Sequence, residues 1–203
     1  MRTQTVVLQK NMKQALIQFL NNISPLKRET QQEVAKIFTL KTYKTDDFFV
    51  KEGAYAKEIG WLESGIMRAY FTNSQAQEYN KQFFVGPSLI GAYSSLLTKE
   101  PNKIAQRALT DCRVYTAPIT QIEALYSRFH DFERLGRKVA EFYFLEKEKK
   151  ELEMALLDAD KRYLLFLKEF KGIDQQIPQY HIASYLGISA TQLSRIRKKL
   201  YTS

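Results

Sequence analysis

The chain has few of the residues that build cross-links and metal centres. It contains one cysteine and two histidines among 203 residues. A single cysteine excludes a disulfide within the chain, a zinc site made of several cysteines, and an iron–sulfur cluster held by this chain alone. Two histidines are too few for most metal sites built from several imidazoles. The sequence therefore predicts no metal centre.

Glycine, proline and long apolar runs are also scarce. Eight glycines and five prolines exclude a collagen-like or low-complexity chain. No apolar run approaches the ~20 residues of a membrane-spanning helix. Residues 1–23 lack the apolar block and cleavage site of a signal peptide. We therefore expect a folded cytoplasmic protein with no membrane partner.

Positive charge is concentrated near the C-terminus. The chain has a net charge of +9, and residues 160–203 carry eight basic and three acidic side chains. A basic segment of this kind is typical of proteins that bind a polyanion, most often nucleic acid. A soluble surface that is merely basic is the alternative.

The hydrophobic pattern divides the chain into three parts and predicts an α+β fold. Residues 1–118 contain two helices and then, from about 39 to 117, many short β-rich runs that indicate a barrel or roll. Residues 119–157 form a helical connector, and residues 158–203 a small basic helical domain. The connector includes one long helix over 131–157, whose apolar stripe is Phe132, Leu135, Val139, Phe142, Leu145, Leu152 and Leu156. We expect this stripe to form a two-fold dimer interface, with Val139, Phe142, Leu145 and Leu152 near its seam.

Residues 179–198, QYHIASYLGISATQLSRIRK, have the spacing of a helix-turn-helix. Four apolar residues form the core between two crossed helices, and Ala183 must be small because the second helix passes close to it. Gly187 supplies the positive φ of the turn, and Ser189 is a suitable N-cap for the second helix. The four core residues are Ile182, Leu186, Leu193 and Ile196.

The second helix of this motif, over about 190–201, has an outward face suited to a DNA major groove. Small polar residues at its start, followed by Arg and Lys, permit a close approach to base edges. The outward residues are Ala190, Thr191, Ser194, Arg195 and Lys198, with Gln192 and Arg197 beside them. An ordinary helical hairpin is the structural alternative.

These residues resemble the Crp/Fnr family of bacterial transcription regulators over nearly the whole chain. The likeness is strongest at LSRIRKKL after LGIS, and extends to ESG followed by IMRAY at 63–70 and to DADKRYLLFL at 158–167. The resemblance implies a cyclic-nucleotide-binding-like β-roll (a jelly roll), a long dimerisation helix and a C-terminal winged helix-turn-helix. It also implies a homodimer that binds double-stranded DNA and contacts RNA polymerase. Gln179, Tyr180 and Ser189 match the positions at which the family contacts phosphates.

The cassette that binds the cyclic nucleotide in this family departs from its pattern. Gly91 matches the family's glycine, but Ala92 stands where a ribose-binding Glu is expected, and Asn102 where a phosphate-binding Arg is expected. Because a bidentate Arg–phosphate contact is among the strongest in such a site, we expect no tight binding of cyclic AMP. Lys103 or Arg107 could supply a replacement charge. An effector pocket, if one exists, would involve Gly91, Ala92, Tyr93, Ser94, Asn102, Lys103 and Ile104.

The family's other sensors and its wing also lack support in the sequence. Only three residues follow Leu200, so a wing could come only from residues 172–177. Haem needs axial His or Cys ligands near the pocket or the long helix, whereas His130 lies at the connector and Cys112 in a strand. The sequence thus predicts no cofactor, and the effector is unidentified.

Two functions remain open at this stage. The first is a homodimeric, sequence-specific DNA-binding transcription regulator. The second is an effector-sensing roll that acts through protein–protein contacts. No nucleotide-binding or hydrolase motif is present, so we expect no catalytic residues and no enzyme activity. We expect Cys112 to be a buried strand residue. We expect His181 to be exposed on the first helix of the motif, and a phosphate contact is the alternative.

Overall fold

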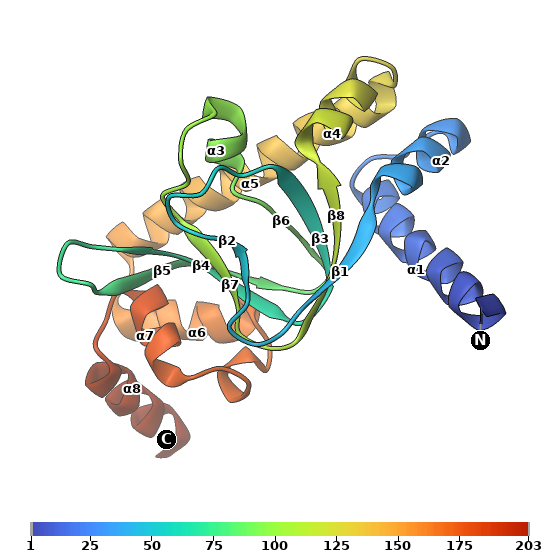
Figure 1. Ribbon diagram of the computed structural model, residues 1–203. Coiled ribbons are helices and arrows are strands. Elements are labelled where there is room, and N and C mark those ends of the chain that lie inside the picture. Colours follow the sequence, from blue (N-terminus) through green and yellow to red (C-terminus); the bar gives the residue numbers. More distant parts are fainter. Residues whose placement is uncertain (1, 203) are drawn as a thin grey trace.

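The structure is a computed structural model that describes residues 2–202, with side chains described for residues 13–200. Strands occupy the middle of the chain and helices its two ends (Figure 1). The helices are α1 (Arg2–Ile23), α2 (Arg28–Ile37), α3 (Tyr93–Thr98), α4 (Ile119–Tyr126), α5 (His130–Leu156), α6 (Ala159–Glu169), the short 3-10 helix η1 (Ile173–Gln175), α7 (Gln179–Leu186) and α8 (Ala190–Thr202). The strands are β1 (Thr39–Tyr43), β2 (Phe48–Val50), β3 (Glu58–Ser64), β4 (Ile66–Thr72), β5 (Glu78–Val85), β6 (Ser88–Ile90), β7 (Ala105–Ala108) and β8 (Cys112–Pro118).

The strands form two antiparallel four-stranded sheets. Their orders are β1-β8-β3-β6 in the first sheet and β2-β7-β4-β5 in the second. The chain crosses between the sheets at Gly65, where φ is +101°, and an added Cβ would lie 2.5 Å from the sulfur of Cys112. Only glycine fits both the left-handed backbone and this close approach. The predicted β-roll is confirmed, with β6 as a strand that the sequence pattern did not indicate.

Successive side chains along each strand point alternately into the space between the two sheets and toward the outer face of their own sheet. Leu62 and Val114 of the first sheet meet Met67 and Ala108 of the second in one buried cluster between the sheets. The side chains next to them, such as Trp61 and Arg68, point outward and are also buried. Each sheet is therefore covered on its outer face by other parts of the chain.

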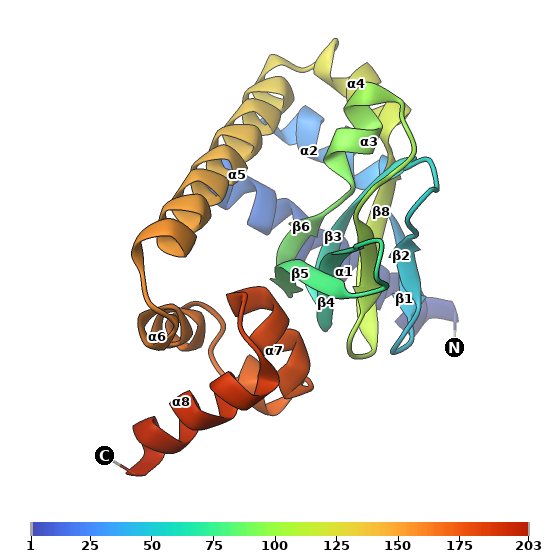
Figure 2. The same cartoon turned by 90° about the vertical axis from the view of Figure 1, so that its left-hand side faces the viewer.

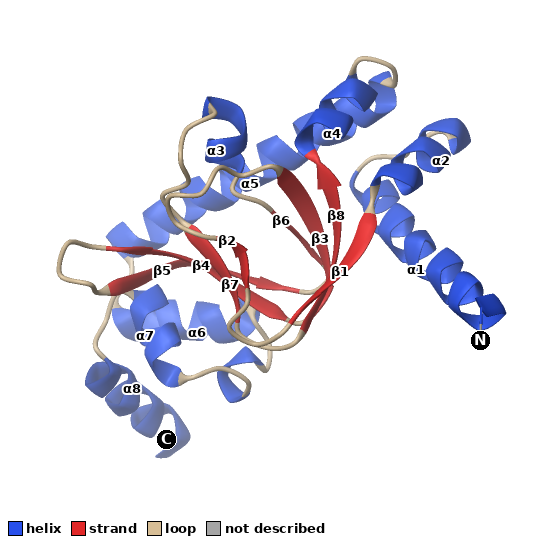
Figure 3. Cartoon of the chain, viewed as in Figure 1, coloured by secondary structure: helices blue, strands red, loops and turns tan. Residues whose placement is uncertain are grey.

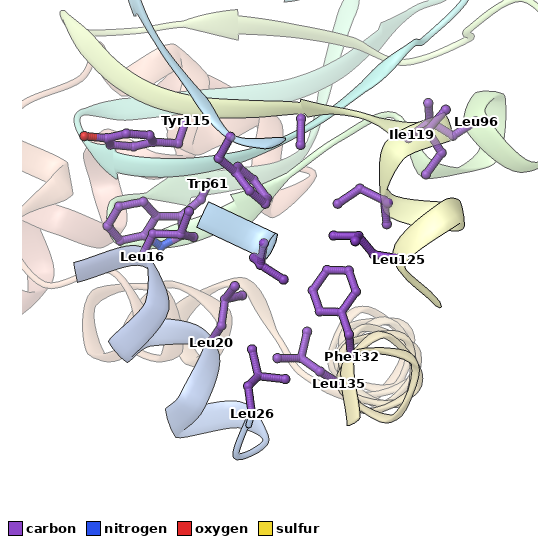
Figure 4. Packing of buried hydrophobic residues seen from close by; sticks show 14 residues of the cluster. Leu16, Leu20, Leu26, Trp61, Leu96, Tyr115, Ile119, Leu125, Phe132 and Leu135 are labelled. Carbon is purple, nitrogen blue, oxygen red and sulfur yellow. The ribbon is translucent and has the colours of Figure 1, made fainter. Parts of the chain in front are cut away.

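Helices cover the outer face of the first sheet. Figure 4 shows Leu16 and Leu20 of α1, Trp61 of β3, and Leu125 and Phe132 from the connector meeting in one cluster. This packing includes the first turns of α5, so the base of the long helix is fixed on the roll. Cys112 is 2% exposed in β8, as expected.

The outer face of the second sheet is covered by residues 158–202, hereafter the C-terminal unit. Figures 2 and 3 show this unit as a group of helices below the strands, joined to α5 at one end. Within its described residues it contains no strand, and residues 172–177, where the sequence allowed a wing, contain η1 instead. The described C-terminal unit therefore has no wing hairpin. None of the described helices has the length and apolar character needed to cross a membrane.

Candidate nucleic-acid interface

The helices α7 and α8 cross over a small apolar core. Ile182, Leu186 and Leu193 are each no more than 1% exposed, and Ile196 is 5% exposed. Ala183 is 2% exposed, in keeping with its predicted place under the second helix. The spacing read from the sequence therefore corresponds to two helices packed through the expected residues.

The turn between these helices has a defined hydrogen-bond pattern. Gly187 has φ +67°, its N–H donates to the carbonyl of Ser184 at 3.2 Å, and the N–H of Ile188 donates to the carbonyl of Ala183 at 3.0 Å. These are the two bonds of a Schellman motif, which ends a helix with a left-handed residue. The hydroxyl of Ser189 then accepts the N–H of Gln192 at 3.1 Å and caps α8.

We expect Gly187→Ala to lower the free energy of unfolding by about 1–2 kcal/mol, because a residue with a Cβ is strained in the left-handed region. Urea unfolding followed by circular dichroism measures this change. Gly91→Ala is the matched control, since its backbone is not left-handed and an added Cβ would meet nothing closer than 3.8 Å. Equal stability of the two variants would contradict the assigned role of Gly187.

The outward face of α8 is polar, basic and accessible. Arg195 and Lys198 are exposed, and so are the smaller residues before them, Ala190, Thr191, Gln192 and Ser194; Arg197 is partly buried. None of the large exposed apolar side chains in the described part of the chain lies on α8. Lys199 instead pairs with Asp160 of α6 at 2.8 Å. The surface of α8 therefore combines small residues near its start with cationic residues further along.

The start of α7 differs in part from the sequence expectation. Tyr180 is 59% exposed, but the side-chain N–H of Gln179 donates to the carbonyl of Asp174 at 2.7 Å, so that amide is held within the protein. The prediction that His181 is exposed is wrong: it is 4% exposed, because this side of α7 packs on the β-roll. The N-terminus of α7 still presents main-chain N–H groups, which favour anions.

The long helix α5 carries two separate apolar stripes. Phe132, Leu135 and Val139 pack against the core of their own chain. Phe142, Leu145, Leu152 and Leu156 are 56%, 60%, 55% and 76% exposed. The stripe predicted from sequence thus includes residues with different surroundings: of its four proposed seam residues, Val139 contacts the intrachain core and the other three lie on the surface.

The region that corresponds to the effector cassette follows β6. Gly91 and the buried Ala92 precede α3, whereas Tyr93 and Ser94 are exposed at its start. Asn102 is 6% exposed, and its amide donates to the carbonyls of Lys51 and Ile104 while its oxygen accepts the N–H of Ile104. The side chain at the expected Arg position therefore joins two loops and carries no charge.

The remaining charges near this loop do not fit a cyclic nucleotide. Arg107 pairs with Asp46 at 2.9 Å on the outer face of the roll. Lys103 lines an open cavity of about 420 Å³, together with Asn102 and two carboxylates, Glu52 and Glu100. Those carboxylates repel a phosphate, and Ala92 offers no acceptor for a ribose hydroxyl. The residues present thus lack the strong contacts of a cyclic-nucleotide site.

This arrangement defines a class of protein: a β-roll joined by a long helix to a compact pair of crossed helices. Residues 40–129 match the family model described as cyclic nucleotide-binding domain. This part of the chain is therefore similar to domains of that type.

Solved structures extend the likeness to the rest of the chain. FixK2 from Bradyrhizobium japonicum has a TM-score of 0.71 and 20% identity, over 82% of this chain and 85% of that chain. CLP, described as a c-di-GMP-responsive global regulator of Xanthomonas campestris, has a TM-score of 0.69 and 16% identity, over 87% and 92%. A Crp/Fnr-family protein from Eubacterium rectale has a TM-score of 0.69 and 14% identity, over 87% and 84%. The resemblance to Crp/Fnr regulators is confirmed at the level of the fold. No curated protein sequence matches the chain.

Proposed function

We propose that this protein is a homodimeric, sequence-specific DNA-binding transcription regulator of the Crp/Fnr type. The observation that carries the proposal is the outward face of α8, where small polar residues are followed by Arg195 and Lys198. A helix with this surface can enter a major groove and bring donors to base edges. A surface for a protein partner would be expected to present large apolar side chains, and the described part of α8 exposes none.

Base reading and phosphate binding fall to different residues in this proposal. Ala190, Thr191, Ser194 and Arg195 face base edges, and Arg195 is the only long donor among them. Ser189 and the N-terminus of α7 bind phosphates, with Tyr180 contributing a hydroxyl and Gln179 its main chain, because its side-chain amide is already bonded. Lys198 adds charge along the same surface. Because the described residues contain no wing, α7 and α8 make the DNA contacts beside the major groove.

The exposed stripe on α5 supports a two-fold dimer. Four large apolar side chains on one helix face form a patch that a soluble monomer rarely leaves open. A two-fold pair would bring two copies of α8 to successive major grooves, about 34 Å apart. Such a regulator acts in the cytoplasm, where it meets DNA and RNA polymerase.

DNA binding is tested most simply by fluorescence anisotropy with mixed duplex fragments at rising salt. Binding through several phosphates should weaken linearly on a plot of log affinity against log salt concentration, with a slope of about −0.9 for each phosphate neutralised. Lack of binding at low salt would reject the proposed function and favour the roll that acts through protein contacts.

Neither cyclic AMP nor cyclic GMP should shift the melting temperature of the protein, because the cassette provides neither the carboxylate nor the guanidinium that holds these ligands. A ligand at a hundredfold excess over its Kd would stabilise the native state by ~2.7 kcal/mol, which differential scanning fluorimetry detects readily. A clear shift at submillimolar nucleotide would show that other groups, such as Lys103, complete the site.

A further inference from the structure

The C-terminal unit is docked on the β-roll through one side of α7 and through an aromatic cluster, in which Phe83 of β5 contacts Phe166, Phe170 and Tyr185. The hydroxyl of Ser184 donates to the carbonyl of Glu78 at 2.9 Å and accepts the N–H of Asn80 at 3.0 Å. Both main-chain groups lie on β5, the edge strand of the second sheet. An edge strand presents unpaired N–H and C=O groups, and here a side chain of α7 satisfies two of them.

A buried polar cluster lies at the same contact. Arg68 of β4 is 2% exposed, pairs with Glu78 at 2.6 Å, and stacks 3.8 Å from the ring centre of Tyr70. One of its N–H groups also donates to the side-chain oxygen of Asn80 at 3.1 Å. The amide nitrogen of Asn80 donates to the carbonyl of His181 at 3.0 Å. The cluster therefore links two strands of the roll to the first turns of α7.

The hydrogen-bond geometry fixes the protonation state of His181. Its Nδ1 atom lies 3.3 Å from a guanidinium nitrogen of Arg68 and 3.3 Å from the amide nitrogen of Asn80. Both of those groups are donors, and the guanidinium has no acceptor atom. Nδ1 must therefore accept, so the imidazole is neutral and carries its proton on Nε2. A proton added to Nδ1 would point at two donors and a fixed positive charge.

We propose that this cluster is an acid-sensitive latch, in which protonation of His181 releases the C-terminal unit from the β-roll. Leu157 and Asp158, between α5 and α6, are the only covalent link that must bend, and both are already non-helical. The proposal concerns a contact between two parts of one chain and does not depend on DNA binding. If α8 does bind DNA, release changes the position of α8 relative to the dimer helix.

Charged groups face His181 from several elements. Arg68 of β4 and Arg107 of β7 disfavour a second positive charge, whereas Glu78 of β5 and Asp46 of the β1–β2 turn favour it. Each carboxylate is paired with one of these arginines, so their effects largely offset. Burial, followed by the charge of Arg68, lowers the pKa of His181 to about 4.

The direction of the pH dependence follows from the difference between the pKa of His181 in the docked unit and its pKa in the released unit. In the released unit His181 regains an ordinary pKa of about 6.5. Docking is therefore fully favoured above pH 6.5 and is lost progressively as the pH falls toward 4. Each pH unit in this interval shifts the docking equilibrium toward release by up to about tenfold. At pH 5 the total shift, relative to neutral pH, is about thirtyfold.

A second contact of the C-terminal unit responds in the opposite direction. Glu169 of α6 lies near Lys150 of α5, and burial raises the pKa of this carboxyl. Acid therefore strengthens the contact between α6 and α5 while it weakens the contact between α7 and the roll. Comparison of variants at His181 separates the two effects, because Glu169 is unchanged in all of them.

Amide hydrogen exchange at pH 7.5 and pH 5.5, corrected for intrinsic rates, tests the latch on peptides from β5 and α7. In the wild-type protein we expect protection of both segments to fall about tenfold at the lower pH. His181→Gln should remove this dependence, because an amide does not titrate. His130→Gln is the matched control: it replaces the only other histidine, which is exposed on α5, and should retain the wild-type response. Emission from Trp61, the only tryptophan and buried in the roll, checks that the roll stays folded.

Equal protection of the wild-type segments at both pH values would overturn the proposal, and so would the same loss in His181→Gln. If His181→Gln is undocked already at pH 7.5, that variant cannot test the latch. The test is then a titration of the wild-type His181 ring, followed by nuclear magnetic resonance. A ring pKa below 6.5, with β5 amide shifts that follow the same titration, supports the latch. A ring pKa near 6.5, or β5 shifts that do not follow it, rejects the latch.

Discussion

Leu145→Glu should convert the proposed dimer into a monomer at micromolar concentration. Leu145 lies in the exposed stripe of α5 and is 60% exposed. A two-fold interface contains it twice, and each copy loses about 1.5–3 kcal/mol of apolar burial. Since about 1.4 kcal/mol corresponds to tenfold in affinity, self-association should weaken by about a hundredfold to ten-thousandfold. Two carboxylates facing each other across the seam weaken it further.

Light scattering coupled to size exclusion measures this outcome directly. Tyr55→Glu is the matched control, because Tyr55 is also 60% exposed but lies in the loop between β2 and β3. The monomeric variant should also lose about a hundredfold or more in affinity for a two-half-site duplex, since it gives up the gain from linked binding. A wild-type protein that is monomeric at micromolar concentration would contradict the assigned role of α5.

Arg195→Ala should reduce the affinity for the preferred DNA site by about 1–3 kcal/mol for each half-site. Arg195 is the one long donor among the proposed base-reading residues, and arginine binds guanine through two parallel hydrogen bonds in the major groove. The loss should depend on the DNA sequence, because the preference for one base is relaxed at one position of each half-site while base preference at the other positions is unchanged. Competition binding with single-base variants of the site measures the effect.

Lys198→Ala is the comparison that distinguishes the loss of a base contact from the loss of a phosphate contact. It should weaken binding evenly across sequences and reduce the salt slope by about one, because its contact is with a phosphate. Lys36→Ala, on α2 at the opposite end of the molecule, should leave both quantities unchanged (Figure 1). If Arg195→Ala alters neither affinity nor sequence preference, the assigned recognition face of α8 is wrong.

Local patterns predict most of the elements that carry the proposed function. The turn at Gly187 and the cap at Ser189 depend on residues within a few positions, so the sequence identifies both. The long helix is equally clear from its period. By contrast, β6 has three residues and is recognisable as a strand only through its pairing with β3.

Contacts between distant parts of the chain set the remaining features. The burial of His181 depends on β4 and β5 lying against α7, which no pattern within 179–198 indicates. The stripe on α5 is continuous in sequence, but its first three residues contact their own chain and its last four are exposed. Periodicity alone shows that a helix face is apolar, and it does not show which partner covers that face.

Selection of bound sequences from random double-stranded DNA, followed by sequencing, tests whether α8 reads DNA as one half of a symmetric dimer. We expect strong enrichment of a two-fold symmetric site whose half-sites are centred about one helical turn apart, with a conserved guanine that loses its conservation in Arg195→Ala. Enrichment of no sequence, or of a single asymmetric half-site by a stable dimer, would contradict it.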